Sequence, residues 1–418
     1  MRQRMITPSA AVVLAAMLFL FSSCIKDDCR RTYKLFTPVY KTLTNLRAEV
    51  QSKPAASVVN SGKLYIRGSW IFMNELNKGI HVIDNSNPSH PVKVSFINIP
   101  GNVDIYTKGN TLYADLYCDL MAADITDPRQ ISVTKYLTNT FPDRSAYTTS
   151  TNPDSIKILV AWTSRDTSVS CGLNPSILNC PGCGIFYNDM MALSASSGSF
   201  SSKAAGTAGS MARFAAVNNY MYAVTTRDLN VIDITNAANP LFVKKKTIGS
   251  DIETIFPYNN KLFIGAGSSM SVYGLDDPAN PLQMSWNGHW CSRDPVVADD
   301  NYAYVTLHEA NGCNSLINQL EIYSLATANT PVLIKEYPMK HPMGLSKEGD
   351  LLFLCDDGLK VYDVQNPGDI KLVKHFPGIN TYDVIATGGI AYVVTKDGLY
   401  QYDYSNPQNI RLISKLLK

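Results

Sequence analysis

Three cysteines stand close together in the stretch CGLNPSILNCPGCG, residues 171–184, and their spacing admits three kinds of chemistry. Cys180 and Cys183 form a Cys-x-x-Cys pair, and Cys171 precedes that pair. Three thiolates could bind zinc, yet no fourth ligand with suitable spacing lies nearby. A redox role would need a thioredoxin-like βαβ context, which the surrounding residues do not offer. A disulfide that fixes a loop is the plainest interpretation, with free thiols and a metal site as the alternatives.

Other cysteines are spread along the chain. Cys291 and Cys313 flank the apolar segment YAYVTL at 302–307, so a disulfide between them would join two long loops. Cys118 and Cys355 lie in or beside predicted strands, where a thiol behaves as a small buried apolar group. The pairing itself cannot be read from the sequence.

Known catalytic and cofactor motifs are missing from the sequence. It contains no hydrolase nucleophile elbow, phosphate loop, dinucleotide fingerprint or paired-His metal motif, so neither a cofactor nor a metal is expected. The 418 residues carry a net charge of only +2, which argues against nucleic acid as a partner. The compact basic run Lys244–Lys246 is interpreted as a solvated strand end.

A short apolar run followed by a polar turn recurs along the chain, for example as GIHVIDNSNP (79–88), GLKVYDVQNP (358–367) and GLYQYDYSNP (398–407). Most copies are about 40 residues apart, a period typical of repeat folds. One longer gap accommodates a degenerate unit, which we assign to SIKILVAW (155–162) and FYNDMMAL (186–193). The residues that follow the apolar run are Asp84, Asp124, Asp233, Gly274, Ser324, Asp363 and Asp403.

Each repeat unit reads as four short strands with little helical patterning. Asp-Gly turns such as 357–358 and 397–398 predict hairpins, because glycine accepts positive φ. Four strands per unit predict an all-β protein, a β-propeller of about eight four-stranded blades, with seven as the alternative. A β-solenoid is less suitable because its repeats are shorter. The segment before Lys63 is interpreted as an innermost strand and residues 409–418 as an outer one, so blade 1 needs no strand from the C-terminus.

The repeated aspartates are not expected to form a carboxylate site. In a ring they would lie on different blades, far from one another. An Asp before a turn usually accepts hydrogen bonds from nearby backbone N–H groups, and this structural role is the one we predict.

The innermost strands of a propeller line its central channel, and the loops that enter them form a rim. Charged and aromatic side chains there would suit a small polar ligand or an ion, unless they pair with one another in a filled channel, which is the interpretation that we favour. The rim candidates are Asp104, Arg213, Glu253, Arg293, Asp294, His341, Tyr382 and Asp383.

The runs LNVIDIT, GIHVID and GLKVYDV resemble the LVIVD repeat of exported bacterial β-propellers. The resemblance extends from about residue 50 to 418, although residues 140–215 depart from the pattern. It implies the propeller architecture and no particular activity, since members of that family mostly lack an assigned biochemical function.

The N-terminus resembles a lipoprotein signal peptide. Arg2 and Arg4 precede the apolar run 10–21, which is too short to span a bilayer as a helix. Ser22, Ser23 and Cys24 resemble a lipobox, although Phe21 stands where leucine is usual, and lipidation at Cys24 would anchor the chain to a membrane. The following Ile25–Asp28 resembles the export tag of bacteroidete-type surface lipoproteins.

We therefore expect a signal peptide at 1–23, a lipidated N-terminus and tether at 24–49, and a propeller at 50–418. The expected location is the outer membrane, on its cell-surface side. The expected role is a binding or scaffolding module for a protein or glycan, with contacts from Trp286, Trp290 and the insertion 171–184. The alternative is a glycan-active lyase or hydrolase at the channel mouth, which rests on analogy of fold.

Overall fold

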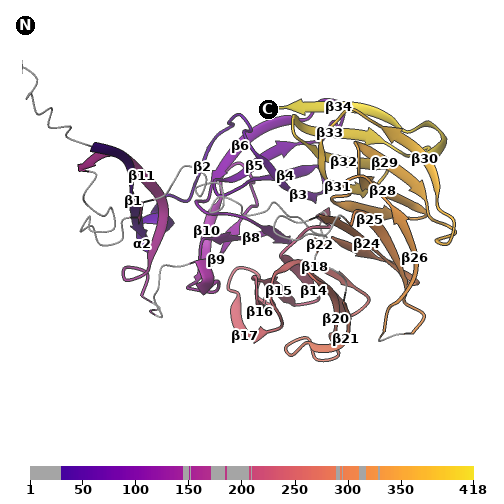
Figure 1. Ribbon diagram of the computed structural model, residues 1–418, viewed down its shortest axis with the longest axis horizontal. Coiled ribbons are helices and arrows are strands. Elements are labelled where there is room, and N and C mark those ends of the chain that lie inside the picture. The colour runs from indigo at the N-terminus through magenta and orange to yellow at the C-terminus, as the bar shows by residue number, and fades with distance from the viewer. Residues whose placement is uncertain are drawn as a thin grey trace, which may run out of the picture. The chain divides into compact units, whose positions relative to one another are not determined.

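The computed structural model describes residues 30–144, 150, 152–170, 184–185, 207–208, 210–288, 292–293, 295–309, 317–327 and 330–418. Tyr40–Leu159 and Ser197–Lys418 together form one unit, which is a seven-bladed β-propeller. Its blades follow one another in chain order around a ring, from blade 1 in purple to blade 7 in yellow (Figure 1). The expected all-β propeller is confirmed, with the smaller of the two expected numbers of blades.

Each blade is an antiparallel sheet whose strands run from the innermost to the outermost in chain order. The strands are β3 (Ser61–Arg67), β4 (Trp70–Glu75), β5 (Gly79–Asp84) and β6 (Val92–Asn98) in blade 1; β7 (Ile105–Lys108), β8 (Thr111–Leu116), β9 (Asp119–Asp124) and β10 (Ser132–Leu137) in blade 2; β14 (Phe214–Val217), β15 (Tyr220–Val224), β16 (Asp228–Asp233) and β17 (Leu241–Thr247) in blade 3; β18 (Ile252–Tyr258), β19 (Lys261–Ala266), β20 (Ser269–Gly274) and β21 (Leu282–Gly288) in blade 4; β23 (Val296–Ala298), β24 (Tyr302–Glu309), β25 (Gln319–Ser324) and β26 (Val332–Pro338) in blade 5; β27 (Leu345–Glu348), β28 (Leu351–Cys355), β29 (Leu359–Asp363) and β30 (Lys371–Phe376) in blade 6; β31 (Thr381–Thr387), β32 (Ile390–Thr395), β33 (Gly398–Asp403) and β34 (Arg411–Leu417) in blade 7. In blade 5 a short strand, β22 (Ser292–Arg293), also pairs with the end of β24.

The unit assigned to 155–193 is not a blade, and the prediction of an eighth one was wrong. Residues 157–170 form a single long strand, β11 (Lys157–Ser170), in a sheet with β1 (Arg30–Thr42) and the short β12 (Gly184–Ile185). A strand of this length has no turn that would return it as a hairpin, which a blade requires. Its partner FYNDMMAL lies outside the described residues.

This small sheet belongs to a second unit, Met1–Val39 with Val160–Ser196. The strand order is β11-β1-β12, and Leu35 pairs with Ile185. Lys34 and Asp166 form an exposed ion pair across β1 and β11, with 3.4 Å between Nζ and Oδ1. Leu35 and Phe36 are the buried apolar residues of β1. Within the segment expected to be a tether, the structure therefore has a strand, followed by the helix α2 (Leu43–Ala48).

The assignment of strands in blade 1 was also wrong. We expected the innermost strand before Lys63, but the segment KLYI (63–66) lies in β3, which is the innermost strand, and β4 (WIFMNE) is the second. The four strands still come from one continuous stretch of chain, so blade 1 needs no strand from the C-terminus, as predicted. A further strand, β2 (Gln51–Pro54), pairs with the outer edge of β6.

The blades pack face to face through buried apolar and tyrosine side chains. Tyrosine hydroxyls reach from one blade to a backbone carbonyl of the next: Tyr113 donates to Ala237 O at 2.8 Å and Tyr222 donates to Pro278 O at 2.8 Å. A buried hydroxyl needs such a partner. Some of the aromatic side chains between blades therefore make polar as well as apolar contacts.

Blades 7 and 1 close the ring through side chains. One apolar cluster combines Leu64, Ile71 and Met73 of blade 1 with Ile385 and Val394 of blade 7. Polar contacts flank it: Ser61 Oγ donates to Thr395 O at 3.0 Å, and Gln401 Nε2 donates to Asn85 Oδ1 at 2.7 Å. The last strand, β34, remains in its own sheet.

The predicted turn role of the repeated aspartates is confirmed. In five blades this Asp accepts a hydrogen bond from the backbone N–H two residues later, as Asp84 does from Ser86 at 2.9 Å and Asp403 from Ser405 at 3.0 Å. Hydrogen bonds from Ser86 lower the pKa of Asp84, and those from Ser405 lower that of Asp403. The remaining three are Asp124, Asp233 and Asp363.

The chain also crosses the centre of the ring. β13 (Thr207–Ala208) pairs with β3 of blade 1. Ser210 Oγ then accepts the N–H of Leu345 in blade 6 at 2.8 Å, and Ala212 O accepts the N–H of Ile255 in blade 4 at 2.6 Å. A segment that contacts the innermost strands of three blades around a ring must lie on its axis. Part of the central channel is therefore filled by the protein's own backbone.

Among the helices that the structure describes, none is long and apolar enough to cross a membrane.

Two glycines of blade 7 should differ in how much stability the protein loses when each is replaced by alanine. Gly398 has φ +141°, and a Cβ there would overlap the carbonyl oxygen of Leu416, whereas Gly388 in the same blade has φ +59° and open space. We expect Gly398→Ala to lower the free energy of unfolding by about 2–5 kcal/mol and Gly388→Ala by about 1–2 kcal/mol. Denaturant unfolding of both variants measures the difference, and equal losses would contradict it.

Candidate functional site

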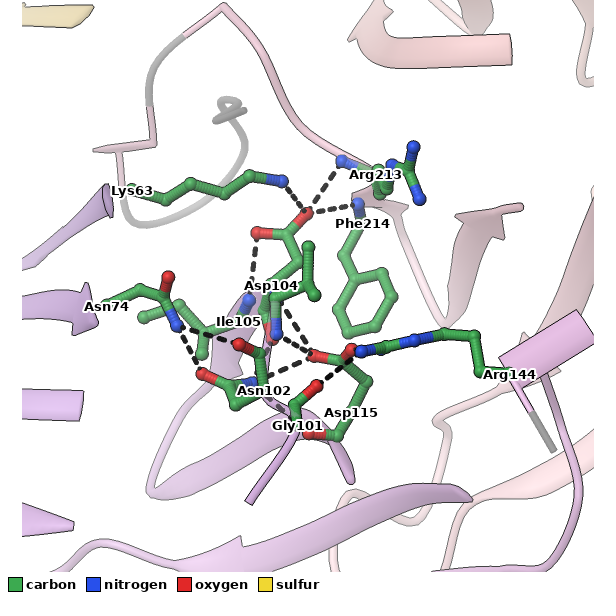
Figure 2. A network of polar contacts seen from close by, with 11 residues as sticks. Lys63, Asn74, Gly101, Asn102, Asp104, Ile105, Asp115, Arg144, Arg213 and Phe214 are labelled. Carbon is green, nitrogen blue, oxygen red and sulfur yellow. Dashed lines mark hydrogen bonds and ion pairs between the residues drawn. The ribbon is translucent and has the colours of Figure 1, made fainter. Parts of the chain in front are cut away.

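Asp104, just before the innermost strand of blade 2, makes contacts with blades 1 and 3 (Figure 2). The residue immediately precedes β7, is only 3% exposed, and its Oδ2 lies 3.2 Å from Lys63 Nζ of blade 1. The same oxygen accepts the backbone N–H groups of Arg213 and Phe214 in blade 3, at 2.6 and 2.9 Å. Burial raises the pKa of Asp104 even though Lys63 opposes that shift. The carboxylate is thus used to hold neighbouring blades together.

Asp115, at the end of β8, performs a similar function inside blade 2. It accepts the N–H groups of Val103 at 2.8 Å and Asp104 at 2.9 Å. Arg144 pairs with the carboxylate of Asp115 and also donates to Gly101 O at 2.6 Å (Figure 2). These contacts fix the loop that brings Asp104 to its position.

Lys63 is a site residue that the sequence analysis missed. It is 2% exposed, and burial lowers its pKa to about 8 against the attraction of Asp104. The strand pairings place Lys63, Asp104 and Arg213 at the same register of three consecutive innermost strands. A correct assignment of KLYI to the innermost strand would have found Lys63, because the register of the other blades points to it.

Charge alternates around the channel entry. Asp383 of blade 7 stands at the same register position as Lys63 and its counterparts in blades 2 and 3. In blade 4 that position is Thr254, and Glu253 is the residue before it. In ring order from blade 7 to blade 4 the signs are negative, positive, negative, positive and negative. Burial lowers the pKa of the Arg213 guanidinium, and the charges of Glu253 and Asp104 oppose that shift. Of these charges, Lys63 and Asp104 form an ion pair, and Lys63 was not among the predicted candidates.

A cavity of about 220 Å³ lies beside this network, between blades 2 and 3. The rings of Phe141 and Phe214 stack in its wall with 5.7 Å between centroids. The other lining residues are Val103, Asp104, Asp115, Asp143, Arg144, Arg213, Val224, Thr225 and Thr226. Asp104, Asp115 and Arg144 in this wall already bind a charged partner or backbone groups, whereas Asp143 is exposed.

A larger cleft, of about 600 Å³, lies on the rim of blades 6 and 7. It brings together two of the predicted candidates, His341 and Tyr382. The side chains of these two residues and of Asp357, Asn380 and Lys396 are exposed. The other lining residues are Met343, Cys355, Gly358, Gly378, Ile379 and Thr381.

Buried groups hold the walls of this cleft. Asp356 accepts the N–H groups of Lys340 and His341 at 3.0 and 2.7 Å, and its other oxygen lies 2.6 Å from Lys360 Nζ. Asp357 adopts φ +53° in the predicted Asp-Gly turn, which directs the chain back into β29. Asp356 is therefore structural, while Asp357 is the carboxylate that the described cleft exposes.

The other predicted residues are dispersed. Asp383 is 4% exposed and packs against Gly344, where a Cβ would overlap its carboxylate. The backbone of Arg293 lies in β22, and Asp294 lies outside the described residues. Cys118 and Cys355 are free and buried, as predicted, and burial raises the pKa of both thiols. The disulfide candidates Cys171, Cys180, Cys183, Cys291 and Cys313 all lie outside the described residues, as does Cys24.

Among the described residues no group of three His, Cys, Asp or Glu side chains is placed to hold a metal ion.

Comparison with known proteins identifies the repeat. The family model of the LVIVD repeat matches residues 60–98 and 208–246, which contain β3–β6 of blade 1 and β14–β16 with most of β17 in blade 3. The chain is thus a β-propeller that carries LVIVD repeats. No curated protein matches the sequence.

Solved structures show the same fold at low sequence identity. The designed protein Ika8 matches with a TM-score of 0.50 and 10% identity, over 88% of this chain and 92% of that one. The periplasmic gluconolactonase PpgL of Pseudomonas aeruginosa matches with 0.50 and 12%, over 85% and 95%. PorZ, a surface component of the type-IX secretion system of Porphyromonas gingivalis, matches with 0.50 and 10%, over 88% of this chain but 39% of its own. At these identities the likeness concerns the fold alone.

Because Lys63 and Asp104 form a buried ion pair, substitutions at the two positions should have non-additive effects on the free energy of unfolding. Lys63→Met leaves the Asp104 carboxylate buried without its cation, and we expect a loss of about 3–5 kcal/mol in the free energy of unfolding. Combining it with Asp104→Asn should cost less than the sum of the two single changes, by about 1–3 kcal/mol. The exposed pair Lys371–Asp369 supplies the control, because Lys371→Met should leave stability nearly unchanged. Additive losses at Lys63 and Asp104 would refute the coupling.

The same lysine predicts a dependence of stability on pH. Folded Lys63 releases its proton near pH 8, and the unfolded chain keeps it to about 10.5. The unfolded state therefore binds more protons in this interval, and the free energy of unfolding should rise with pH from 8 to about 10. Chemical denaturation at several pH values measures the slope. The slope should be smaller in Lys63→Met, and an equal slope in both proteins would contradict this origin.

Proposed function

We propose that this LVIVD-repeat propeller is a binding or scaffolding module for a protein or glycan, held at the cell-surface side of the outer membrane by a lipid on Cys24. The observation that carries the binding role is the contrast between the two parts of the rim. At blades 1–3 the buried Asp104 binds Lys63 and backbone N–H groups, and at blades 6 and 7 polar and aromatic side chains remain accessible around one cleft.

The chemistry of the cleft suits a glycan. Tyr382 offers an aromatic ring that is 36% exposed, and Asn380, His341 and Lys396 offer polar groups around it. Binding sites for small molecules combine apolar surface with a few such convergent polar groups. The rings of His341 and His308 form a T-shaped contact with 5.4 Å between centroids, which supports the orientation of His341 at the cleft.

A glycan-active enzyme at the channel mouth is the second candidate, and the geometry favours it less. Glycoside hydrolysis usually requires two carboxyl groups on either side of the scissile bond. The described lining of the cleft includes one, Asp357, which already forms an ion pair with Lys340 at 2.6 Å. At the channel entry, Asp104 is paired with Lys63 and with backbone N–H groups, so it is a poor general base.

The membrane location rests on the sequence. The basic start, the apolar run 10–21 and the Ser-Ser-Cys ending at Cys24 support export and lipidation. A surface location would place the propeller where proteins and glycans from outside the cell are accessible. Contacts from Trp290 and from 171–184 remain part of this proposal, and those residues lie outside the described part of the chain.

Ligand binding can be tested by screening an array of bacterial and host glycans with the purified protein. We expect Tyr382→Ala and His341→Ala each to weaken binding of a captured glycan at least about tenfold, because each removes a contact in the cleft. Tyr302→Ala is the control, since this partly buried tyrosine lies outside the cleft. Equal binding by all variants would exclude the cleft, and turnover of a glycan would support the enzyme instead.

Localisation has a separate test. Cys24→Ala removes the thiol that would carry the lipid, so the protein should move from the membrane fraction to the soluble fraction. Protease treatment of intact cells should degrade the native protein if it faces outward. A Cys24→Ala protein that stays in the membrane fraction would show that the lipid anchor is wrong.

A further inference from the structure

The outer strand of blade 4 differs from the other outer strands of the ring. β21 has the sequence LQMSWNG and carries no charged side chain. Every other outer strand carries at least one lysine, namely β6, β10, β17, β26, β30 and β34. Charged residues, lysine above all, are the usual means by which proteins prevent an exposed strand edge from pairing with another chain. β21 lacks this protection.

All seven outer strands share one register, which makes their positions comparable. Each has a one-residue bulge at the same place, as at Met284 in β21 and Val243 in β17. Trp286 in β21 therefore corresponds to Lys245, Glu336, His375 and Lys415 in four other blades. In the two remaining blades an aromatic residue stands there, Phe96 in β6 and Tyr136 in β10.

Those two aromatic residues are covered by the chain itself. Strand β2 pairs along β6 and places Lys53 opposite Phe96, which is 9% exposed. The guanidinium of Arg47 lies over the ring of Tyr136, at 4.5 Å from its centroid. Trp286 is 63% exposed, and no described strand pairs with the outer edge of β21. An aromatic side chain at this register thus marks a covered position in blades 1 and 2, whereas in blade 4 the cover is missing from the described residues.

We propose that the outer edge of β21 pairs with the β21 edge of a second copy of this chain, antiparallel and around a two-fold axis. Strand β2 on β6 shows that an outer edge of this propeller accepts an added antiparallel strand. In a pair centred on Ser285, uncharged residues face each other throughout, and Met284 faces Trp286. The same pairing of β17 would place Lys244 opposite Lys244, and like charges directly opposite one another are unfavourable. A strand that can oppose its own copy without charge repulsion fits an isologous contact.

Photo-crosslinking of the full-length chain tests this contact in the cells that make it. A photoreactive phenylalanine analogue replaces Gln283, which is exposed in β21. We expect a covalent adduct of two chains whose cross-linked peptides, identified by mass spectrometry, both come from the two β21 segments. Trp286→Lys should reduce the adduct about tenfold or more. This variant should fold, because Lys245 and Lys415 already occupy the same position in β17 and β34.

The controls separate a β21 contact from other effects. Lys245→Ala and Lys415→Ala, at the same register on other blades, should leave the adduct unchanged. Ser285→Lys supplies a second test of the edge, since lysine stands at the equivalent position in β17 as Lys244. The proposal is overturned by the absence of a two-chain adduct, by adducts formed with a different protein alone, or by an adduct that persists unchanged in folded Trp286→Lys and Ser285→Lys.

Discussion

Side-chain packing between neighbouring blades is the interaction on which the rest of the molecule depends. The seven blades are each complete in themselves, and blade 7 meets blade 1 through an apolar cluster flanked by hydrogen bonds. Among the described strands, none is shared between blades 7 and 1. The position of every rim residue therefore follows from the fit of buried aliphatic and tyrosine side chains, and the hydroxyls that reach the next blade fix the spacing.

The polar residues of the rim fall into two groups, one buried and paired and the other exposed. Near blades 1–4 the channel entry brings charges close together in a buried space, and alternating signs make this arrangement tolerable. Asp104 and Asp115 there accept hydrogen bonds from backbone N–H groups and form ion pairs with cationic side chains. Near blades 6 and 7 it is Asp356 that accepts backbone hydrogen bonds, and the side chains of His341 and Tyr382 lie at the surface. This division is the observation on which the proposed binding role rests.

Much of the architecture could be predicted because the repeat is encoded locally. The Asp at the end of each apolar run and the glycine at the start of such runs as 358–363 act within a few residues, so their roles were visible in the sequence. The false eighth blade arose at 155–193, because alternation of apolar residues predicts a strand and does not reveal its partner. Lys63 was missed for a related reason: its environment depends on Asp104, which lies in another blade. The rim candidates His341 and Tyr382 line one cleft. The sequence could not show which acids would be paired, because the partner of Asp104 lies in another blade.

The segment that crosses the axis has a consequence for how this protein acquires its structure. Ser210 accepts a hydrogen bond from Leu345, which lies 135 residues later in the chain. During synthesis from the N-terminus, residues 207–212 are made before blades 4 and 6, to which they bind. The centre of the ring can therefore be completed only after most of the propeller has emerged. Contacts of such long sequence separation slow folding, and we expect the order of assembly to end with the central segment locked in place by the C-terminal blades.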